Sequence, residues 1–482
     1  MIMIQALQLI LALSFLVVIH EFGHFTFARL FHVRVEKFYL FFDYKLALLR
    51  AKRFDGKWHF RFLSPSLGDD DEWNKHPETT EWGIGWIPFG GYCAIAGMVD
   101  ETHDAASLGN DAQPWEFRSK NVWQRLLIIS GGILVNFVAA LLIFGMLLFH
   151  WGSSTLPLRN IDRGLYYSSI LQQEGFEQQD RILLIDGQEP ETLGDVVQWL
   201  IIEGKRDVIV QRGQETVQLE MSKDLGNRYL ALQNDYDRQE RDKARQDPSY
   251  IKQRFILIDE FYPFVIDSVC PNTAAYYAGL QTNDSLTAIN GIPTPCFAAV
   301  VEQLRLHPCD SIQLTYYREG VEQTTSAFIG DQCRLGVFEK GPLAYFELEH
   351  KEYTFWEAIP AGIVYGWNYL KMYVKQFRLV FSKEGAQSLG GFGAIGQMFP
   401  KYWDWATFWN MTAILSLILA FMNFLPIPGL DGGYILFLLF EIITRRQPSD
   451  KFLERANMFG WIILIALLIF ANGNDLLKWL FM

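Results

Sequence analysis

The chain has few basic residues and few cysteines for its 482 residues. Lys and Arg number 42 against 54 Asp and Glu, which gives a formal net charge of −12 at pH 7. No basic stripe stands out in its polar part, so we expect no nucleic-acid partner, because such partners require clustered positive charge. The first apolar run has neither a basic segment before it nor a small-residue cleavage site after it, so we expect a retained helix rather than a cleaved signal peptide.

Hydrophobic sequence, by contrast, makes up 50% of the chain. Much of it is gathered in four runs, each roughly as long as the 17 to 25 residues that span hydrocarbon. We expect transmembrane helices at residues 1–30, 121–152, 406–443 and 456–473. The sequence therefore predicts a multi-pass α-helical membrane protein with four transmembrane helices and soluble domains inserted after the second.

Basic residues are unevenly placed around these runs. They cluster in the segment 31–120 and between the third and fourth runs, as at Arg445 and Arg446. Because loops rich in Lys and Arg stay in the cytoplasm, both segments are expected to be cytoplasmic. Both termini and residues 152–402 are then expected on the extracytoplasmic side.

The polar part contains an internal repeat, because the pattern of residues 175–187 recurs at residues 279–291. Each copy has an Asp that begins a short strand, an Asp-Gly or Asn-Gly turn, a helix and a closing hairpin. We expect two α+β domains, at residues 160–222 with a flanking segment and at residues 253–345. The charged residues 223–252 between them are expected to form a linker or an inserted helix.

Both copies of this repeat resemble PDZ domains of the bacterial periplasmic type. The resemblance implies that they bind the termini of other chains by adding them as a strand at a sheet edge. The alternative is a pair of packing modules without a ligand.

Four of the 5 cysteines, namely Cys270, Cys296, Cys309 and Cys333, fall in the second copy. An oxidising compartment would allow one or two disulfides there, and four thiols allow three full pairings, between which the sequence does not choose. Cys93 lies in the expected cytoplasmic segment and is predicted to be a reduced thiol.

Three ionisable residues, His20, Glu21 and His24, lie inside the first apolar run in the pattern His-Glu-x-x-His. Residues four apart on a helix share a face, so His20 and His24 can bind one metal ion, and imidazole ligands favour zinc over calcium or magnesium. Glu21 lies beside them, where it can act as a general base. Gly23 would let another backbone approach the helix. The alternative is a chance match, although ionisable groups at membrane depth are costly and usually functional.

Two His do not complete a catalytic zinc site, and the end of the third run supplies a candidate for the third ligand. There Pro426 and Pro428 break the helix shortly before Asp431. An Asp on irregular backbone at membrane depth is expected to face a cation. The alternative is a helix that ends at the membrane surface in an ordinary Pro/Gly turn.

His-Glu-x-x-His followed by Asn-x-x-Pro-x-Pro-x-Leu-Asp-Gly resembles the site-2 protease family of intramembrane zinc metalloproteases. The tandem PDZ copies are similar to its bacterial RseP-like branch, and the resemblance covers nearly the whole chain. The residues that the resemblance implies are the zinc ligands His20, His24 and Asp431, the catalytic base Glu21, and Asn423, which would help to hold the substrate.

Residues 87–92, which include Gly90, Gly91 and Tyr92, are similar to the family's membrane-dipping β-hairpin. The resemblance implies that this hairpin places the substrate by strand pairing, and the alternative is an ordinary cytoplasmic loop. Farther along, Asn136 resembles the asparagine of the family's Gly-Pro-x-x-Asn element near the substrate, but Ile133 stands where the family has proline.

Apolar residues also recur every three or four positions over residues 353–382. This spacing predicts an amphipathic helix that lies on the bilayer or braces the two PDZ-like domains.

The sequence thus predicts a zinc endopeptidase that cleaves transmembrane segments of membrane proteins. The resemblance implies a bacterial inner-membrane location with periplasmic PDZ domains, and substrates such as anti-sigma factors or remnant signal peptides. The PDZ pair would exclude intact proteins. One alternative is a catalytically idle PDZ scaffold, which would not need Glu21. Another is an ion-coupled transporter, which would be expected to show inverted repeats that the sequence lacks.

Overall fold

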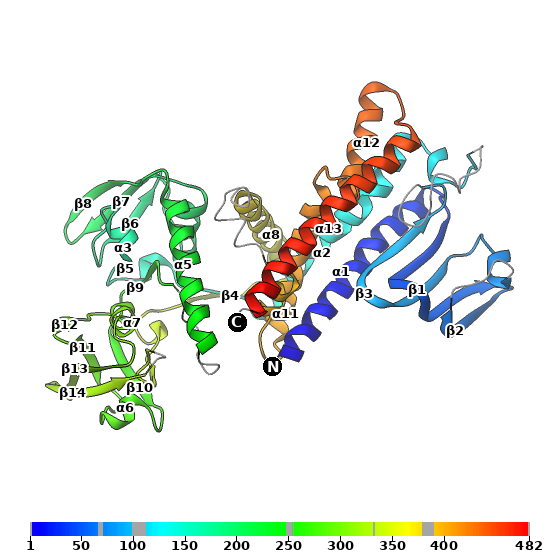
Figure 1. Ribbon diagram of the computed structural model, residues 1–482. Coiled ribbons are helices and arrows are strands. Elements are labelled where there is room, and N and C mark those ends of the chain that lie inside the picture. The colour runs from blue at the N-terminus through cyan, green and yellow to red at the C-terminus, as the bar shows by residue number, and fades with distance from the viewer. Residues whose placement is uncertain are drawn as a thin grey trace. The chain divides into compact units, whose positions relative to one another are not determined.

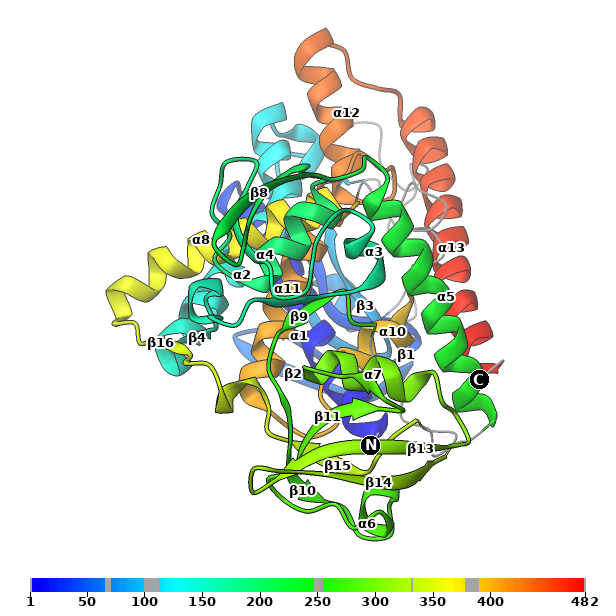
Figure 2. The same ribbon diagram turned by 90° about the vertical axis from the view of Figure 1, so that its left-hand side faces the viewer.

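The computed structural model describes residues 2–65, 71–98, 112–246, 253, 255–330, 333–377 and 390–480. The chain forms two compact units (Figures 1 and 2). The first consists of Met1–Gly152, Glu352–Tyr373 and Gly390–Leu476, and the second of Ser153–Lys351, Val374–Leu389 and Leu477–Met482.

Long apolar helices dominate the first unit. They are α1 (Ile2–Leu30), α2 (Val122–Trp151), α11 (Trp405–Phe424), α12 (Asp431–Thr444) and α13 (Asp450–Leu480), with the short α10 (Phe392–Gln397) before α11. In the described part, four helical stretches have the length and composition to cross a membrane: Met3–Leu30, Val122–Trp151, Trp405–Phe424 and Lys451–Gly473.

The range 406–443, expected as one helix, is divided into α11 and α12. Pro426 and Pro428 cannot continue the helical hydrogen-bond pattern, and Gly429 adopts a φ of +91° between them and Asp431. Asp431 is consequently the first residue of a new helix and does not lie on irregular backbone.

The helix α2 lies at the centre of this unit and packs against α1, α11 and α12. Its approach to α1 is closest at two facing glycines. A Cβ on Gly131 would lie only 2.7 Å from the carbonyl oxygen of Gly23, and a Cβ on Gly23 would collide with the carbonyl of Gly131. Gly23 therefore permits the close approach of a second backbone, as its sequence context suggests.

A three-stranded sheet follows α1, with strand order β2-β1-β3. Its strands are β1 (Val35–Phe54), β2 (Lys57–Pro65) and β3 (Glu81–Ile95). Residues 90–95 are thus the end of a 15-residue strand and not an ordinary loop. The sheet is strongly irregular, since Tyr39 of β1 is paired with both Gly83 and Tyr92 of β3.

The second unit contains the two repeats. The first has β5 (Leu165–Tyr167), β6 (Arg181–Ile185), β7 (Asp207–Arg212), β8 (Glu215–Glu220) and β9 (Ile258–Glu260), with α3 (Ser169–Gln172) and α4 (Leu193–Val197). The second has β10 (Phe264–Val269), β11 (Ser285–Ile289), β12 (Ile292–Pro293), β13 (Asp310–Arg318), β14 (Val321–Ile329) and β15 (Val337–Glu339), with α6 (Ala274–Tyr277) and α7 (Phe297–Arg305).

In each repeat an arginine forms an equivalent ion pair with a buried aspartate. Arg212 Nη2 lies 2.8 Å from Asp180 Oδ2 in the first copy, and Arg318 Nη2 lies 2.6 Å from Asp284 Oδ2 in the second. In both copies the arginine also donates to the carbonyl of the glycine that begins the repeated segment, Gly175 or Gly279. This shared arrangement is the structural counterpart of the sequence repeat.

The boundary between the repeats differs from the one that the sequence suggests. The strand β9 pairs with β5, and Leu257 and Tyr262 pack in the core of the first copy, although both fall in the range 253–345 assigned to the second. The expected linker forms helix α5 (Leu225–Gln246), which packs on the same core, while residues 247–252 lie outside the described residues.

None of the five cysteines forms a disulfide in the described parts of the chain. Cys296 and Cys333 are buried in different apolar clusters, so the fold does not bring these two sulfur atoms together. Burial raises the pKa of the Cys296 thiol to about 11.

The amphipathic helix expected at 353–382 is α8 (Phe355–Phe377), and residues 378–382 lie outside the described residues. Its buried face consists of Ala358, Gly362 and Gly366. These small residues let α8 contact the backbone of α2 near Gly145, a packing mode common between membrane helices. The short strands β4 (Ser153–Thr155) and β16 (Glu349–Lys351) pair where the chain enters and leaves the second unit.

Candidate active site

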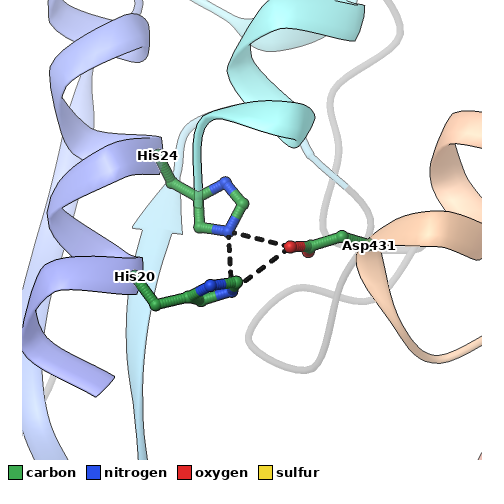
Figure 3. Close-up of side chains that lie close together, drawn as sticks. All are labelled: His20, His24 and Asp431. Atoms are coloured by element: carbon green, nitrogen blue, oxygen red, sulfur yellow. Dashed lines mark hydrogen bonds and ion pairs between the residues drawn. The ribbon is translucent and has the colours of Figure 1, made fainter. Parts of the chain in front are cut away.

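Two histidines of α1 and the first residue of α12 converge at one point (Figure 3). His20 Nε2 lies 3.2 Å and His24 Nε2 lies 3.3 Å from Asp431 Oδ2, and the two Nε2 atoms are 3.3 Å apart. Both imidazoles are buried. The structure therefore brings together the three residues that the sequence predicts as metal ligands.

Local structure explains how Asp431 reaches this point. A Cβ on Gly432 would collide with the carbonyl of Leu425, and one on Gly433 would lie 2.6 Å from the carbonyl oxygen of Ile427. The two glycines thus allow the first turn of α12 to pack directly on the loop that follows α11.

Hydrogen bonds from α2 orient both imidazoles. His24 Nδ1 lies 3.0 Å from the carbonyl oxygen of Ile128, which accepts a hydrogen bond and leaves Nε2 of His24 with its lone pair. His20 Nδ1 lies 3.2 Å from the side-chain nitrogen of Asn136, whose amide oxygen is buried without a partner. With the amide oxygen and nitrogen of Asn136 exchanged, His20 Nδ1–H donates to Oδ1 and Nε2 of His20 keeps its lone pair.

With these tautomers, three atoms that carry lone pairs face one another with no hydrogen between them. The carboxylate atom among these three, Asp431 Oδ2, is buried and accepts no hydrogen bond. The candidate donor atoms of the three residues all lie within 4.8 Å of one another. Such a set requires a cation, and two imidazole nitrogens with one carboxylate oxygen match a catalytic zinc site that keeps one position open.

Glu21 follows His20 on α1 and is half-buried. It lies close enough to His24 for an electrostatic interaction between the two side chains. A carboxylate at this place can accept a proton from a nucleophilic water beside the three ligands.

Gly91 and Tyr92, two of the residues predicted to contact the substrate, occupy the end of β3. A Cβ on Gly91 would lie 2.7 Å from Cγ1 of Val17, so β3 passes α1 about one turn before His20. Gly90 precedes them with a φ of +152°. The Tyr92 hydroxyl donates to Asp43 at 2.9 Å. Burial and this carboxylate raise the pKa of Tyr92, so its hydroxyl stays protonated and donates within the sheet.

The other two predicted substrate residues are separated. Asn423 is half-buried in the last turn of α11, and in the described structure its side chain makes no hydrogen bond to the three ligands. Asn136, expected near the substrate, contacts His20. Its position on α2 accounts for this contact, because α2 packs directly against α1.

Two contributions to this site were not found from the sequence. The Ile128 carbonyl gives no signal, because every residue has a carbonyl group. The ion pair between Arg125 of α2 and Glu441 of α12, at 2.5 Å, holds the helix that carries Asp431. Glu441, a carboxylate among the apolar residues of α12, was the sequence signal that could have indicated this ion pair.

The model of Peptidase family M50 matches residues 8–66 and 71–467. The chain belongs to peptidase family M50. Among M50 relatives, the regulator of sigma-E protease RseP of Salmonella typhimurium is 27% identical over 482 residues, covering 97% of both chains. Protease RseP of Yersinia pestis is 24% identical, also with 97% of both chains covered. A Vibrio cholerae protein whose name assigns it to the zinc metalloproteases is 26% identical, with the same coverage.

As a member of M50, the protein is a zinc metalloprotease of the site-2 type. Zinc, when bound, polarises the scissile carbonyl and lowers the pKa of water. His20, His24 and Asp431 would hold the metal, and hydrogen bonds from α2 orient the two imidazoles. Glu21 would take the proton of the attacking water and pass it to the leaving amine.

The candidate active site leaves no room for a side chain at Gly132 of α2. A Cβ there would lie 2.6 Å from both His20 Cε1 and His24 Nε2. We therefore expect Gly132→Ala to lower zinc affinity by roughly 10- to 100-fold, the range typical of disturbed ligand orientation. Zinc content after dialysis against a chelator, measured by elemental analysis, checks this result.

Gly473→Ala in α13 is the matched control for this substitution, because a Cβ there meets open space. It should keep its zinc. A Gly132→Ala protein that holds zinc as tightly as the control would contradict the described packing of α2 on the ligands.

Proposed function

We propose that the protein cleaves substrates within or beside their transmembrane segments, in the inner membrane of a bacterium. The observation that carries this proposal is the place of the site. His20, Glu21 and His24 lie within the apolar stretch Met3–Leu30, one of the stretches long enough to cross a membrane. A peptide bond must therefore reach the site at membrane depth.

The expected orientation follows from the basic residues. The sheet β1–β3 and the segment between α12 and α13 carry the clusters of Lys and Arg that favour the cytoplasmic side. We place the second unit, with its two repeats, on the periplasmic side.

The two repeats, in this proposal, are PDZ domains that restrict access to the site. Their described residues contain no cluster of His, Cys, Asp or Glu that could hold a metal, so binding is favoured over chemistry. The repeats would recognise chain termini exposed by an earlier cleavage and exclude intact outer domains. Because one relative is named a regulator of sigma-E protease, anti-sigma factors are the proposed substrate class, with remnant signal peptides as the second.

The end of β3 is the proposed docking edge for the substrate. In the described structure, residues 91–95 pair with β1 on one side, and no strand pairs with their other side. A helical substrate hides its carbonyls, and strand pairing at this edge would hold it extended near His20. Asn423 is proposed to assist in holding it.

Strand pairing with the substrate would use main-chain hydrogen bonds of this edge rather than side chains. A proline in the edge strand has no backbone N–H, so Cys93→Pro removes a main-chain donor. We expect turnover of a single-span membrane substrate to fall by about tenfold, because one main-chain hydrogen bond is lost and the proline ring obstructs pairing.

Cys93→Ala is the matched variant, since it changes the side chain and keeps the amide. It should cleave at nearly the wild-type rate, and both variants should retain zinc. Mapping the cleaved bond by mass spectrometry tests the wider proposal. Equal turnover of the two variants would show that β3 does not pair with the substrate, and a cut far outside the transmembrane segment would overturn the intramembrane assignment.

A further inference from the structure

A cavity of the first unit lies at the C-terminal end of α1, apart from His20, His24 and Asp431. It has a volume of about 470 Å³ and is open to solvent. The residues that line it are Arg29, His32, Val33, Arg34, Pro77, Glu78 and Trp115. Three of these side chains are cationic or can become so.

The basic groups of this cavity are only partly neutralised by the protein. Arg29 and His32 are exposed and form no ion pair in the described residues. Arg34 contacts Glu36 through Nη2 at 3.1 Å, and its guanidinium lies over the Trp115 ring. The Nε atom of Arg34 is nevertheless buried without a hydrogen-bond acceptor. A buried donor of this kind favours an acceptor supplied by a ligand.

The lining includes one carboxylate, Glu78, and it is directed to other groups. Its Oε1 lies 3.3 Å from Nδ1 of His76, and its side chain is 63% exposed at the rim. Because Glu36 pairs with Arg34 and Glu78 is directed to His76, Arg29 keeps its charge available within the cavity, and this arrangement suits an anion.

The cavity also lies near the ends of two apolar helices of the first unit. It begins where α1 ends at the exposed Leu30 and lies beside the segment that leads into α2. Trp115 in its wall is 43% exposed, and Trp123 in the first turn of α2 is 61% exposed. Exposed tryptophans at the ends of apolar helices are typical of the headgroup layer of a bilayer.

We propose that this cavity binds the phosphate of an anionic phospholipid headgroup. Arg29, His32 and Arg34 would donate to the phosphate oxygens, and Trp115 would lie at the level of the glycerol backbone. The acyl chains would extend along the apolar surface of α1. Arg29 lies five residues after His24 on the same helix. A bound lipid would therefore fix the depth in the bilayer of α1, the helix that carries two of the proposed zinc ligands. The proposal needs α1 to cross the bilayer but not the peptidase chemistry.

The test is a titration of phosphatidylglycerol into the purified full-length protein in a neutral detergent, followed by native mass spectrometry. Phosphatidylcholine serves as the zwitterionic comparison. Arg29→Gln should weaken phosphatidylglycerol binding by about fivefold, the equivalent of about 1 kcal/mol for one basic side chain near an anionic lipid. Because the Arg29 side chain is exposed, its replacement is not expected to unfold the protein. The double variant Arg29→Gln/His32→Gln provides a second test and should weaken binding as well.

Arg455→Gln is the matched control, because Arg455 is exposed on α13, lies on the same expected side of the membrane and is remote in sequence from the cavity. It should bind phosphatidylglycerol as the wild type does. Equal binding of the two lipids, or equal effects of Arg29→Gln and Arg455→Gln, would overturn the proposal. Displacement of the lipid by millimolar inorganic phosphate would also overturn it and identify a site for soluble phosphate.

Discussion

Replacing His24 by alanine is expected to remove zinc and peptidase activity together. The imidazole is one of the three proposed protein ligands, and its Nδ1 donates to the Ile128 carbonyl at 3.0 Å. Zinc sites with four ligands contribute about 10–16 kcal/mol, so one ligand accounts for roughly 3 kcal/mol, or a loss of affinity of about 100-fold or more. Asp431→Ala should behave in the same way. Elemental analysis and cleavage of a model membrane substrate are the two measurements.

His150→Ala provides the control for this experiment, since His150 lies in the last turn of α2 and is not one of the converging residues. It should retain both zinc and activity. A His24→Ala protein with full zinc and full activity would contradict the ligand set.

Glu21→Gln should separate metal binding from catalysis. The substitution keeps the size of the side chain and removes the group that accepts a proton, while the three ligands are unchanged. We expect zinc content equal to that of the wild type and turnover lower by about 100- to 10,000-fold, the usual contribution of a positioned general base. Rates must be compared at saturating zinc, so that a small change in affinity does not affect the comparison.

Two outcomes would count against this role of Glu21. Turnover close to that of the wild type would exclude it as the base. Loss of zinc in Glu21→Gln would make it a ligand, and the site of His20, His24 and Asp431 would then have to be extended.

The candidate metal ligands could be proposed from the sequence alone because each rests on a strong local rule. Helix periodicity places His20 and His24 on one face, and Pro426 with Pro428 marks a break before Asp431. That the three converge is a long-range property, and the expectation for it came from the resemblance to a family. The structure supplies the distances.

Other features depend on contacts that no local pattern encodes. The partner of Asn136 is His20, and this follows from how closely α2 packs on α1, which is set by Gly131 and Gly132. The return of β9 to β5 could not be predicted either, because the repeat pattern aligns the two copies and contains no information on a strand exchanged between their segments. The break at Pro426 and Pro428 within the range 406–443 is predicted from the sequence, since prolines exclude a continuous helix, but the new helix that begins at Asp431 is not.

The distribution of the ligands between α1 and α12 has a consequence for how the protein is made. Asp431 is synthesised about 400 residues after His20 and His24, which at roughly 5 to 20 residues per second takes on the order of 20 to 80 seconds. During this interval the nascent chain has two imidazoles and no third candidate ligand, so it should hold zinc weakly. Completion of the candidate site therefore waits for α12, and no separate inhibitory segment is needed to delay it.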